Sequence, residues 1–254
     1  MGPVVVDVGN TRVKWGLCSS AQVWSIASLP PDDTQAWQQQ WHEWKLQRPQ
    51  EWIVSGVHPQ RRDALVAWLQ ERSDEVLVLA SYKLLPIRVE LPDPEKVGID
   101  RLLNAVAANR RRQENVAAIL VDAGSAVTVD YVDGSGAFRG GAIFPGFRVM
   151  AQGLHEHTAQ LPVVAMDEGV LPPGTSTTHA IQAGVYHAVL GGIERLIVEY
   201  QHRFPAVFEI FLTGGDAKLF SARLHHPVHY WPEMTLEGIL HSRPNVPPKS
   251  RARE

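Results

Sequence analysis

The sequence predicts an α/β protein with mixed sheets, made of two related halves, and three observations support this. Runs of β-branched residues alternate with segments of helical composition along most of the chain. Hairpins follow two of the strands and imply antiparallel pairing, whereas later crossovers through helices imply parallel pairing. One local pattern also occurs twice, 115 positions apart (122 − 7): a strand ends in an aspartate, and glycine with a small polar residue follows.

The first half begins with a strand and its hairpin partner. Val4–Val8 is an unbroken β-forming run, and Arg12–Leu17 follows a Gly9-Asn10 turn. Further along this half we expect strands at Gln22–Ser28, Trp52–Val57, Val76–Leu79 and Ile87–Leu91, and helices at Asp33–Gln47, Arg61–Arg72 and Ile99–Arg112.

One predicted helix of this half carries a stripe of tryptophans. Trp37, Trp41 and Trp44 stand at i, i+4 and i+7, which places them on one helix face. The stripe could form an aromatic binding surface. Packing in a core or an interface is the favoured interpretation, because helical spacing by itself explains it.

The second half repeats the opening pattern. Ala117–Val121 is a strand, Val127–Val132 its hairpin partner, and a glycine-rich turn leads into Phe138–Ile143. His179–Phe204 reads as one long helix, and Phe208–Thr213 as a strand before another glycine turn. We therefore expect halves at residues 1–113 and 114–242, followed by a disordered, Pro-rich basic tail at 243–254.

Composition narrows the function classes. The 254-residue chain has a net charge of −3, which predicts neither a nucleic-acid nor an anionic-membrane partner. Cys18 is the only cysteine, so no internal disulfide is possible, and its strand-like setting predicts a core residue. No apolar run approaches the ~20 residues of a membrane helix. Met1 leads directly into a strand without a signal-peptide pattern, so we expect a cytoplasmic protein.

The first acidic turn is a candidate phosphate site. Gly9 lets the backbone approach a ligand, Asn10 and Thr11 can donate hydrogen bonds, and Lys14 adds positive charge. Asp7 cannot bind a phosphate directly, but it can hold Mg²⁺, often through water. A β-turn in which the aspartate caps its own backbone is the structural alternative.

The second acidic turn, Asp122–Thr128, offers the same chemistry through Asp122, Gly124 and Ser125. A third turn, Thr213–Ala217, contains paired glycines that could lie against a flat adenine or ribose. The β-turn alternative applies to the second turn as well, and a tight strand–helix connection explains the third turn equally well in isolation. The two acidic turns at matching places in the two halves strengthen the functional interpretation.

Two more segments carry chemistry. Gly98–Arg101 sets an aspartate beside an arginine at a helix start, which fits a general base next to a group that binds an anion. Asp in a first helical turn with a solvated Arg is the alternative. Gly140–Gly146 ends a strand and could form a hinge or a cleft wall. Common nucleotide motifs with GxGxxG or GxxxxGK[ST] spacing are absent, and the histidines lack a zinc pattern.

Taken in order, these segments resemble the type III pantothenate kinases of the acetate kinase/sugar kinase/Hsp70/actin superfamily. The resemblance spans residues 7 to 217 and rests on the following blocks: Asp7–Thr11, Gly98–Arg101, Asp122–Ala126, Gly140–Gly146, Thr213–Ala217, and Ser176-Thr177 followed by Ala180-Ile181 and Gly184. It implies two ribonuclease-H-like halves of the actin-like ATPase type that bind ATP, usually as a homodimer. The implied activity is ATP-dependent phosphorylation of the pantothenate hydroxyl, the first step of coenzyme A biosynthesis.

The resemblance also implies residue roles. Asp100 would be the general base and Arg101 would bind the pantothenate carboxylate. Asp122 would hold a monovalent cation, K⁺ or NH₄⁺, and Asp7 would organise Mg²⁺. The other implied contacts are to pantothenate from Leu91, Gly98, Ile99 and Thr177, and to ATP from Ser125 and from Asp7, Val8, Gly9, Asn10, Thr11, Arg12, Val13 and Lys14.

Three positions depart from the family pattern. Ser125 replaces a threonine and keeps the hydroxyl, Ser176 replaces an asparagine, and Leu91 stands where an aromatic residue of the acceptor pocket is expected. Two alternatives therefore stay open. One is a superfamily kinase with another small hydroxyl acceptor, and the other is a non-catalytic nucleotide-binding regulator.

Overall fold

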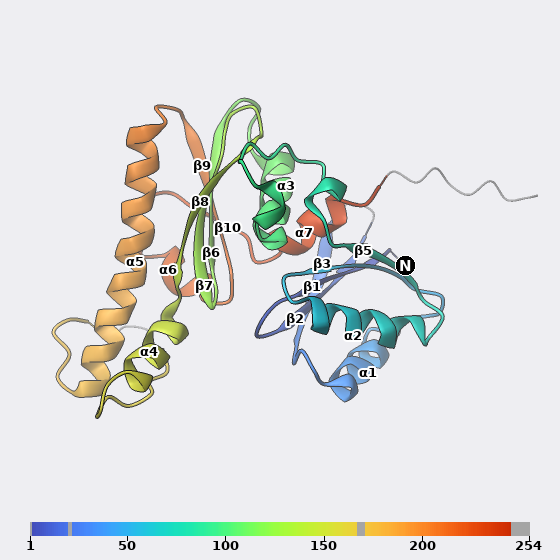
Figure 1. The fold of residues 1–254 in the computed structure, drawn as a ribbon, viewed down its shortest axis with the longest axis horizontal. Helices are drawn as coiled ribbons and strands as arrows, with labels where there is room; N and C mark the ends of the chain where they lie inside the picture. The colour runs from blue at the N-terminus through green and yellow to red at the C-terminus, as the bar shows by residue number, and fades with distance from the viewer. Residues whose placement is uncertain (1, 20–21, 167–170, 245–254) are drawn as a thin grey trace, which may run out of the picture. The chain divides into compact units, whose positions relative to one another are not determined.

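The computed structural model describes residues 2–19, 22–166 and 171–244. Two compact units divide the chain (Figure 1): residues 1–86 with 236–254 form the first, and residues 87–235 form the second. Each contains one five-stranded mixed sheet. None of the helices in the described ranges combines the length and apolar character that a bilayer crossing needs. The predicted tail at 243–254 falls almost entirely outside the described residues.

The first sheet has the strand order β3-β2-β1-β4-β5. β1 pairs antiparallel with β2 and parallel with β4, so hairpin and crossover connections meet at the same central strand. The elements of this unit before residue 87 are β1 (Val4–Val8), β2 (Val13–Cys18), β3 (Val23–Leu29), α1 (Thr34–Glu43), β4 (Glu51–Gly56), α2 (Pro59–Gln70) and β5 (Glu75–Leu79).

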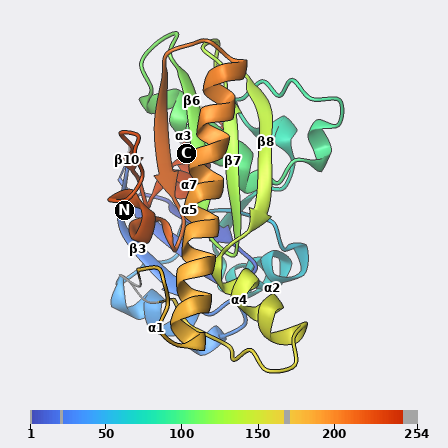
Figure 2. The ribbon, with the colours of Figure 1, turned by 90° about the vertical axis from the view of Figure 1, so that its left-hand side faces the viewer.

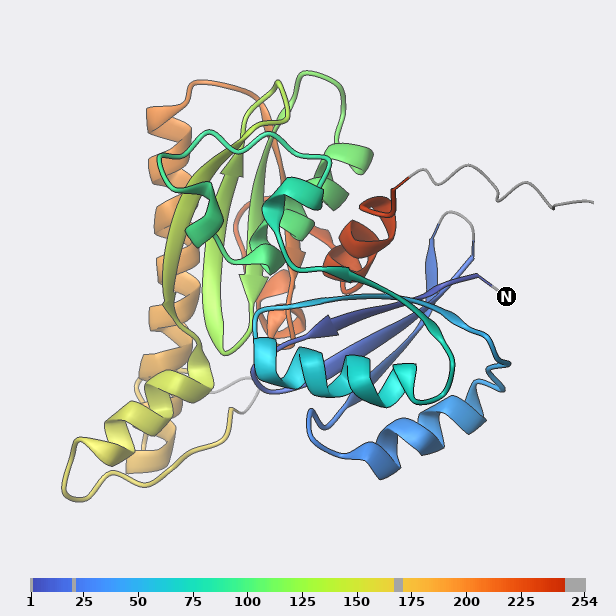
Figure 3. The same cartoon turned by 45° about the vertical axis from the view of Figure 1, so that its right-hand side comes forward.

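Helices α1 and α2 cover one face of the first sheet (Figure 3). Alternate residues of the strands point to this face, and they pack with Leu65, Trp68 and Leu69 of α2. Trp37 and Trp41 of α1 are 2% and 4% exposed and join the same cluster. The tryptophan stripe therefore packs in the core and does not form an aromatic binding surface. Cys18 is buried as well, and burial raises the pKa of its thiol to about 12, as expected for a core cysteine.

The second sheet has the order β10-β9-β6-β7-β8. Its central strand β6 pairs antiparallel with β7 and parallel with β9. Read from the other edge, the pattern of hairpins and crossover matches the first sheet, which confirms the predicted class of two ribonuclease-H-like mixed sheets. Its strands are β6 (Ala117–Ala123), β7 (Ala126–Val132), β8 (Phe138–Pro145), β9 (Phe208–Thr213) and β10 (His229–Tyr230).

Helices lie on both faces of the second sheet. The long helix α5 (Thr177–Arg203) runs along one face (Figure 2), where Val189, Ile193 and Ile197 pack on the strands. Helix α3 (Ile99–Arg111) packs against β6 and β7 from the other side. The remaining helices are α4 (Phe147–Glu156), α6 (Ala217–Ser221) and α7 (Met234–His241).

One strand expected from the sequence differs in the structure. Ile87–Leu91 forms only a single-residue bridge, Val89 with Phe138, because prolines at either side interrupt the pairing. α3 and the segment before it pack with the second sheet, so the compact units change at residue 87. The division into halves at 1–113 and 114–242 stays a prediction.

Candidate active site

The first acidic turn joins β1 to β2 and is open to solvent. The Gly9 amide donates a hydrogen bond to the Arg12 carbonyl at 3.0 Å, which closes the turn, and residues 10–12 are exposed. Val8 and Val13 are fully buried in the core, so only their backbone groups can face a ligand. The turn therefore offers backbone amides and polar side chains, as the phosphate interpretation requires.

Two neighbours hold this turn in place. The guanidinium of Arg61, at the start of α2, donates to the Asn10 carbonyl and to both carboxylate oxygens of Asp32 at 3.1–3.2 Å. Gly56 at the end of β4 has φ of 154°, and a Cβ there would lie 2.3 Å from the Val8 carbonyl oxygen. Only glycine permits this close approach of β4 to the end of β1.

Asp7 lies within a row of polar residues across the first sheet. It is in register with Lys14 on β2 and with Ser55 on β4, and in-register neighbours project from the same face. Ser55 is buried and donates to the Leu79 carbonyl at 2.8 Å. The predicted Mg²⁺ organiser thus stands beside a lysine that suits phosphate.

Asp122 lies within the equivalent row of the second sheet. It is in register with Thr128 on β7 and with Thr213 on β9. Thr213 is 1% exposed, and its hydroxyl oxygen has no hydrogen-bond partner within the described ranges. A carboxylate flanked by hydroxyl oxygens is a donor set that fits a hard cation.

Glycine turns converge on the end of β6. The Gly146 amide donates to the Ser125 carbonyl at 2.9 Å, and the Asp216 amide donates to the Ala123 carbonyl at 2.9 Å. Gly214 has φ of 107°, and a Cβ there would lie 2.3 Å from the Ala123 carbonyl oxygen. The structure thus brings the second and third predicted turns together at the carboxyl ends of parallel strands, where ligands of α/β sheets bind.

Helix α3 connects the Gly98–Arg101 segment to Asp122. The Asn104 amide donates to the Asp122 carboxylate at 3.3 Å, and Asn104 in turn accepts from the Thr235 hydroxyl at 2.8 Å. Asn104 follows Asp100 by one helical turn, so both project from a similar face of α3. The predicted base and the predicted cation ligand therefore belong to one helix–strand contact.

Asp100 and Arg101 begin α3, after the Gly98 cap. The Asp100 carboxylate accepts the Arg101 backbone amide at 2.8 Å. Burial raises the pKa of Asp100, although its hydrogen bonds and the Arg101 charge oppose the shift. A carboxylate with a raised pKa beside a cation has the properties of a general base next to an anion-binding group.

Leu91 lies beside Gly140, the first residue of the Gly140–Gly146 segment. A Cβ on Gly140, whose φ is 98°, would lie 3.3 Å from Leu91 Cδ2. Gly98, Ile99, Asp100 and Arg101 are consecutive, so they share one place at the start of α3. Leu91 and the α3 start both lie in the second unit, and both adjoin β8 or its partner β7.

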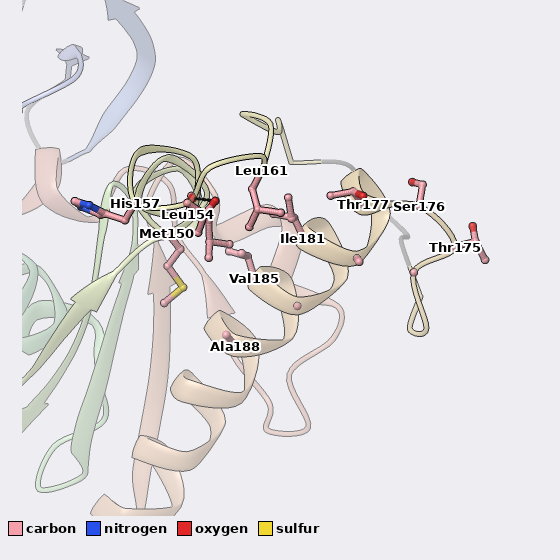
Figure 4. A pocket seen from close by; sticks show the side chains of 15 residues that line it. Met150, Leu154, His157, Leu161, Thr175, Ser176, Thr177, Ile181, Val185 and Ala188 are labelled. Carbon is pink, nitrogen blue, oxygen red and sulfur yellow. Dashed lines mark hydrogen bonds between the residues drawn. The ribbon is translucent and has the colours of Figure 1, made fainter.

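Thr177 lies apart from that group, on a pocket of about 920 Å³ between α4 and α5. Figure 4 shows Met150, Leu154 and Leu161 facing Ile181 and Val185 across it, with Ser176 and Thr177 at the α5 start. Ser176 caps α5 by accepting the His179 amide at 3.2 Å. Asp100, Arg101 and Asp122 do not line this pocket, so its size does not locate the chemistry.

Sequence reasoning missed several residues that adjoin the predicted ones. Asp130 binds Arg101, Asn104 binds Asp122, Arg61 holds the Asn10 backbone, and Arg148 donates to the Ser125 hydroxyl at 3.0 Å. Asp130 is separated from Arg101 by 29 positions, and only the β7–α3 packing brings them together. The polar residues buried in otherwise apolar segments, Asn104 and Asp130, were the available signal.

No cluster of three or more His, Cys, Asp or Glu side chains in the described ranges is arranged to hold a metal ion. Mg²⁺ does not require such a cluster, since one or two carboxylates with substrate phosphates and waters complete its shell. Asp7 fits that mode, because it supplies carboxylate oxygens beside a turn suited to phosphate, and the Asp122–Thr213 pair supplies oxygen ligands for the second predicted cation, K⁺ or NH₄⁺.

The family model for type III pantothenate kinase matches residues 4–199. A type III pantothenate kinase of Alkalilimnicola ehrlichii is 32% identical over 245 residues, covering 93% of this chain and 95% of that protein. One from Treponema pallidum (strain Nichols) is 39% identical over 169 residues, or 66% of this chain; the chain spans 60% of that relative's length.

Solved structures share the fold. A Campylobacter jejuni protein described as a conserved Baf family transcriptional activator has a TM-score of 0.61 at 20% identity, covering 96% of this chain and 100% of that one. The ADPNP-bound activator of 2-hydroxyisocaproyl-CoA dehydratase from Clostridium difficile has a TM-score of 0.52 at 11% identity, covering 95% and 92%. With the family match over most of its length, this chain belongs to the type III pantothenate kinase family.

Proposed function

We propose that this chain transfers the γ-phosphoryl group of ATP to the hydroxyl group of pantothenate, giving 4′-phosphopantothenate and ADP. One observation carries the proposal within the second unit: α3 presents a half-buried base, Asp100, and one turn later binds Asp122 through Asn104. Helix α3 thus carries the proposed base for the acceptor and also binds Asp122, the carboxylate proposed to act on the nucleotide side. Membership of the family supplies the identity of the two substrates.

In the proposed reaction, the Asp100 carboxylate accepts the proton of the acceptor hydroxyl. The hydroxyl oxygen forms a bond to the γ-phosphorus while the bond from that phosphorus to the β–γ bridging oxygen breaks, and ADP leaves. The proton remains on Asp100 until solvent removes it. Phosphoryl transfer depends on alignment and charge stabilisation more than on covalent catalysis, so the chief task of the chain is to orient both substrates.

Arg101 binds the acceptor carboxylate, which holds the hydroxyl at Asp100. Backbone groups of the Asp7–Lys14 turn and the Lys14 side chain bind the ATP phosphates, and Ser125 contacts the nucleotide. Asp7 holds Mg²⁺ and Asp122 holds a monovalent cation, K⁺ or NH₄⁺. When bound, these cations neutralise charge on the phosphates.

The test is an ATP-dependent pantothenate phosphorylation assay on wild type and Asp100→Asn, with Asp93→Asn as control. Asp93 lies in the exposed loop before α3, where its side chain pairs with Lys96. Loss of a general base lowers kcat by about 10²- to 10⁴-fold, whereas the control should match wild type. Wild type without turnover would contradict the proposed function, and an active Asp100→Asn variant would contradict the base assignment alone.

The pH profile provides a second readout of Asp100. The base works ionised, so activity falls as pH decreases through its pKa. An ordinary aspartate has a pKa of about 3.9. Because burial raises the pKa of Asp100, the acid limb of the profile should lie above that value. The residual activity of Asp100→Asn should lack this limb.

Leu91 favours one alternative, a kinase for another small hydroxyl acceptor. Its aliphatic side chain lies beside Gly140, at the position where the family is expected to have an aromatic residue of the acceptor pocket. The same assay with other hydroxy acids in place of pantothenate separates the two. A nucleotide-binding regulator would bind ATP and turn over none of them.

Assembly and location stay predictions. We propose a homodimer, and the exposed apolar residues around the α4–α5 pocket, among them Leu154 and Val163, support an interface in that region. We also place the enzyme in the cytoplasm, where ATP and the precursors of coenzyme A are available.

A further inference from the structure

We propose that Asp130 is a positioning residue for the acceptor site: its buried carboxylate fixes the Arg101 guanidinium so that the opposite edge of the guanidinium meets the acceptor carboxylate. The inference rests on the proposed function, because it takes the acceptor to be an anion bound by Arg101. Asp130 itself is not a catalytic residue, since it acts through Arg101.

Arg101 and Asp130 form a bidentate pair, in which two guanidinium nitrogens donate to one carboxylate. Arg101 Nε lies 3.0 and 3.1 Å from the two Asp130 carboxylate oxygens, and Arg101 Nη2 also donates to Asp130 Oδ1. Bonds along one edge fix both the plane and the rotation of a guanidinium. Arg101 Nη1 has no protein partner within the described ranges, so it remains for a ligand.

The second sheet is built to admit this carboxylate. Asp130 on β7 is in register with Gly141 on β8. A Cβ on Gly141 would lie 2.2 Å from Asp130 Oδ1 and 2.3 Å from the Val129 carbonyl oxygen. Any side chain at 141 would therefore displace the carboxylate that Arg101 binds. The glycine pair that the sequence suggested as a hinge or wall thus has a definite local use.

Stability alone is a weak reason for this ion pair. The Asp130 side chain is 1% exposed and that of Arg101 13%, so both charges lose most of their hydration. Buried ion pairs replaced by apolar pairs often cost a protein nothing. The ring of Phe138 also flanks the guanidinium, with its centroid 5.6 Å from Arg101 Cζ. Such an enclosed, oriented cation suits recognition of a carboxylate better than it suits the core.

The charges around Asp130 are consistent with an ionised carboxylate under assay conditions. Burial raises the pKa of Asp130 to about 6, while Arg101 lowers it and Asp100 raises it further. Tyr200 of α5 is a further titratable neighbour, and its hydroxyl donates to the Val129 carbonyl at 2.9 Å. Measurements should therefore be made at a pH well above 6.

The variant Asp130→Asn separates orientation from charge. Its side chain keeps the shape of Asp130, but its amide group offers Arg101 one acceptor oxygen instead of two, and its NH₂ group faces an N–H group of Arg101 in place of the second oxygen. If orientation dominates, Arg101 turns away and binding of the acceptor carboxylate weakens. If the main effect of Asp130 is to neutralise Arg101, then the variant binds the anionic acceptor more tightly.

The experiment compares two acceptors. One is pantothenate and the other its primary alcohol, in which CH₂OH replaces the carboxylate. We expect Asp130→Asn to raise KM for pantothenate on the order of tenfold, the effect of one charged hydrogen bond, with KM for ATP unchanged. The value of kcat/KM for the alcohol should change far less, because that acceptor has no carboxylate. General damage to the fold would lower kcat/KM for both acceptors equally.

Asp133→Asn is the matched control. Asp133 directly follows β7, and its carboxylate binds Arg139 and Ser135 rather than Arg101. It should leave the preference for pantothenate over the alcohol unchanged. Should Asp130→Asn fail to fold, Arg101→Lys replaces it. A single ammonium group cannot bind Asp130 and the acceptor carboxylate along two edges as a guanidinium can. The preference for pantothenate over the alcohol should therefore be lost.

The outcomes are separable. Wild type without turnover of pantothenate overturns the proposed function and this inference with it. Turnover by wild type, combined with an Asp130→Asn variant whose acceptor preference is unchanged or whose KM for pantothenate falls, overturns the inference alone. An Arg101→Lys variant with full preference for pantothenate does the same. A selective loss of that preference in Asp130→Asn supports it.

Discussion

The two sheets have the same strand order but place different side chains beside their aspartates. In the first sheet, Asp7 is flanked by Lys14 and Ser55. In the second, Asp122 is flanked by Thr128 and Thr213. A lysine adds positive charge, which suits a polyanion, whereas hydroxyl oxygens add ligands, which suit a cation. We therefore propose that the repeated topology gives two sites that bind groups of opposite charge.

The turns that follow the two aspartates differ in the same sense. Between β1 and β2 the chain leaves residues 10–12 exposed, and Arg61 is the side chain that holds their backbone. The turn between β6 and β7 is contacted by Gly146 and by the Gly214 turn, whose backbones leave no space for a Cβ. An open loop can close around a large ligand, whereas a packed one is preformed for a small ion or a flat group.

The largest effect should come from breaking the packed turn. Gly214→Ala places a Cβ 2.3 Å from the Ala123 carbonyl oxygen and forces alanine into a φ of 107°. Strain of this kind costs about 3 kcal/mol. That corresponds to a fall in melting temperature of roughly 6–12 °C for a chain of this size. Thermal unfolding followed by circular dichroism measures it.

Two alanine variants calibrate that result. A Cβ on Gly9, in the open turn, would lie 3.1 Å from the Arg12 carbonyl oxygen, so Gly9→Ala should cost clearly less. Gly191→Ala in α5 meets nothing within 4 Å and should stabilise the helix by about 0.5–1 kcal/mol. Equal melting temperatures for Gly9→Ala and Gly214→Ala would contradict the contrast between an open and a packed turn.

Much of this contrast could be predicted from the sequence. The runs of β-branched residues that end in Asp7 and Asp122 located both central strands, and the hairpins after them gave the mixed sheets. The pairing of Asp122 with Thr213 could not be predicted, since it depends on the register of a parallel strand 91 positions away (213 − 122). Local patterns predict elements, while long-range register decides which side chains flank a carboxylate.

The candidate site shows the same limit. Asp100 and Arg101 were predicted because they are adjacent in the sequence, and the structure shows α3 presenting both. Asp130 and Asn104 were not predicted, because each contributes one polar atom to a partner on another element. Such residues resemble ordinary members of a strand or helix until packing makes them neighbours. Burial of a polar side chain is the physical sign that such a residue has a partner on another element.

Exchanging the carboxylates for amides should separate the two cation responses. Asp7→Asn should raise the Mg²⁺ concentration needed for half-maximal activity by roughly 10- to 100-fold while leaving activation by K⁺ or NH₄⁺ intact. Asp122→Asn should abolish activation by the monovalent cation with little change in the Mg²⁺ response. Steady-state rates over a matrix of both cations measure this, and each variant is the control for the other. Identical responses would show that the rows of side chains do not distinguish the sites.

The smallest effect should come from loosening the open turn. Arg61→Ala removes the donor to the Asn10 carbonyl and the pair with Asp32, while every group proposed to contact ATP remains. A partly exposed contact of this kind contributes about 1 kcal/mol, so KM for ATP should rise by roughly five-fold with kcat nearly unchanged. Arg62→Ala is the matched control, because the neighbouring Arg62 pairs with Asp63 instead. An unchanged KM in Arg61→Ala would mean that the Gly9–Arg12 hydrogen bond and the Gly56 contact suffice to shape the loop.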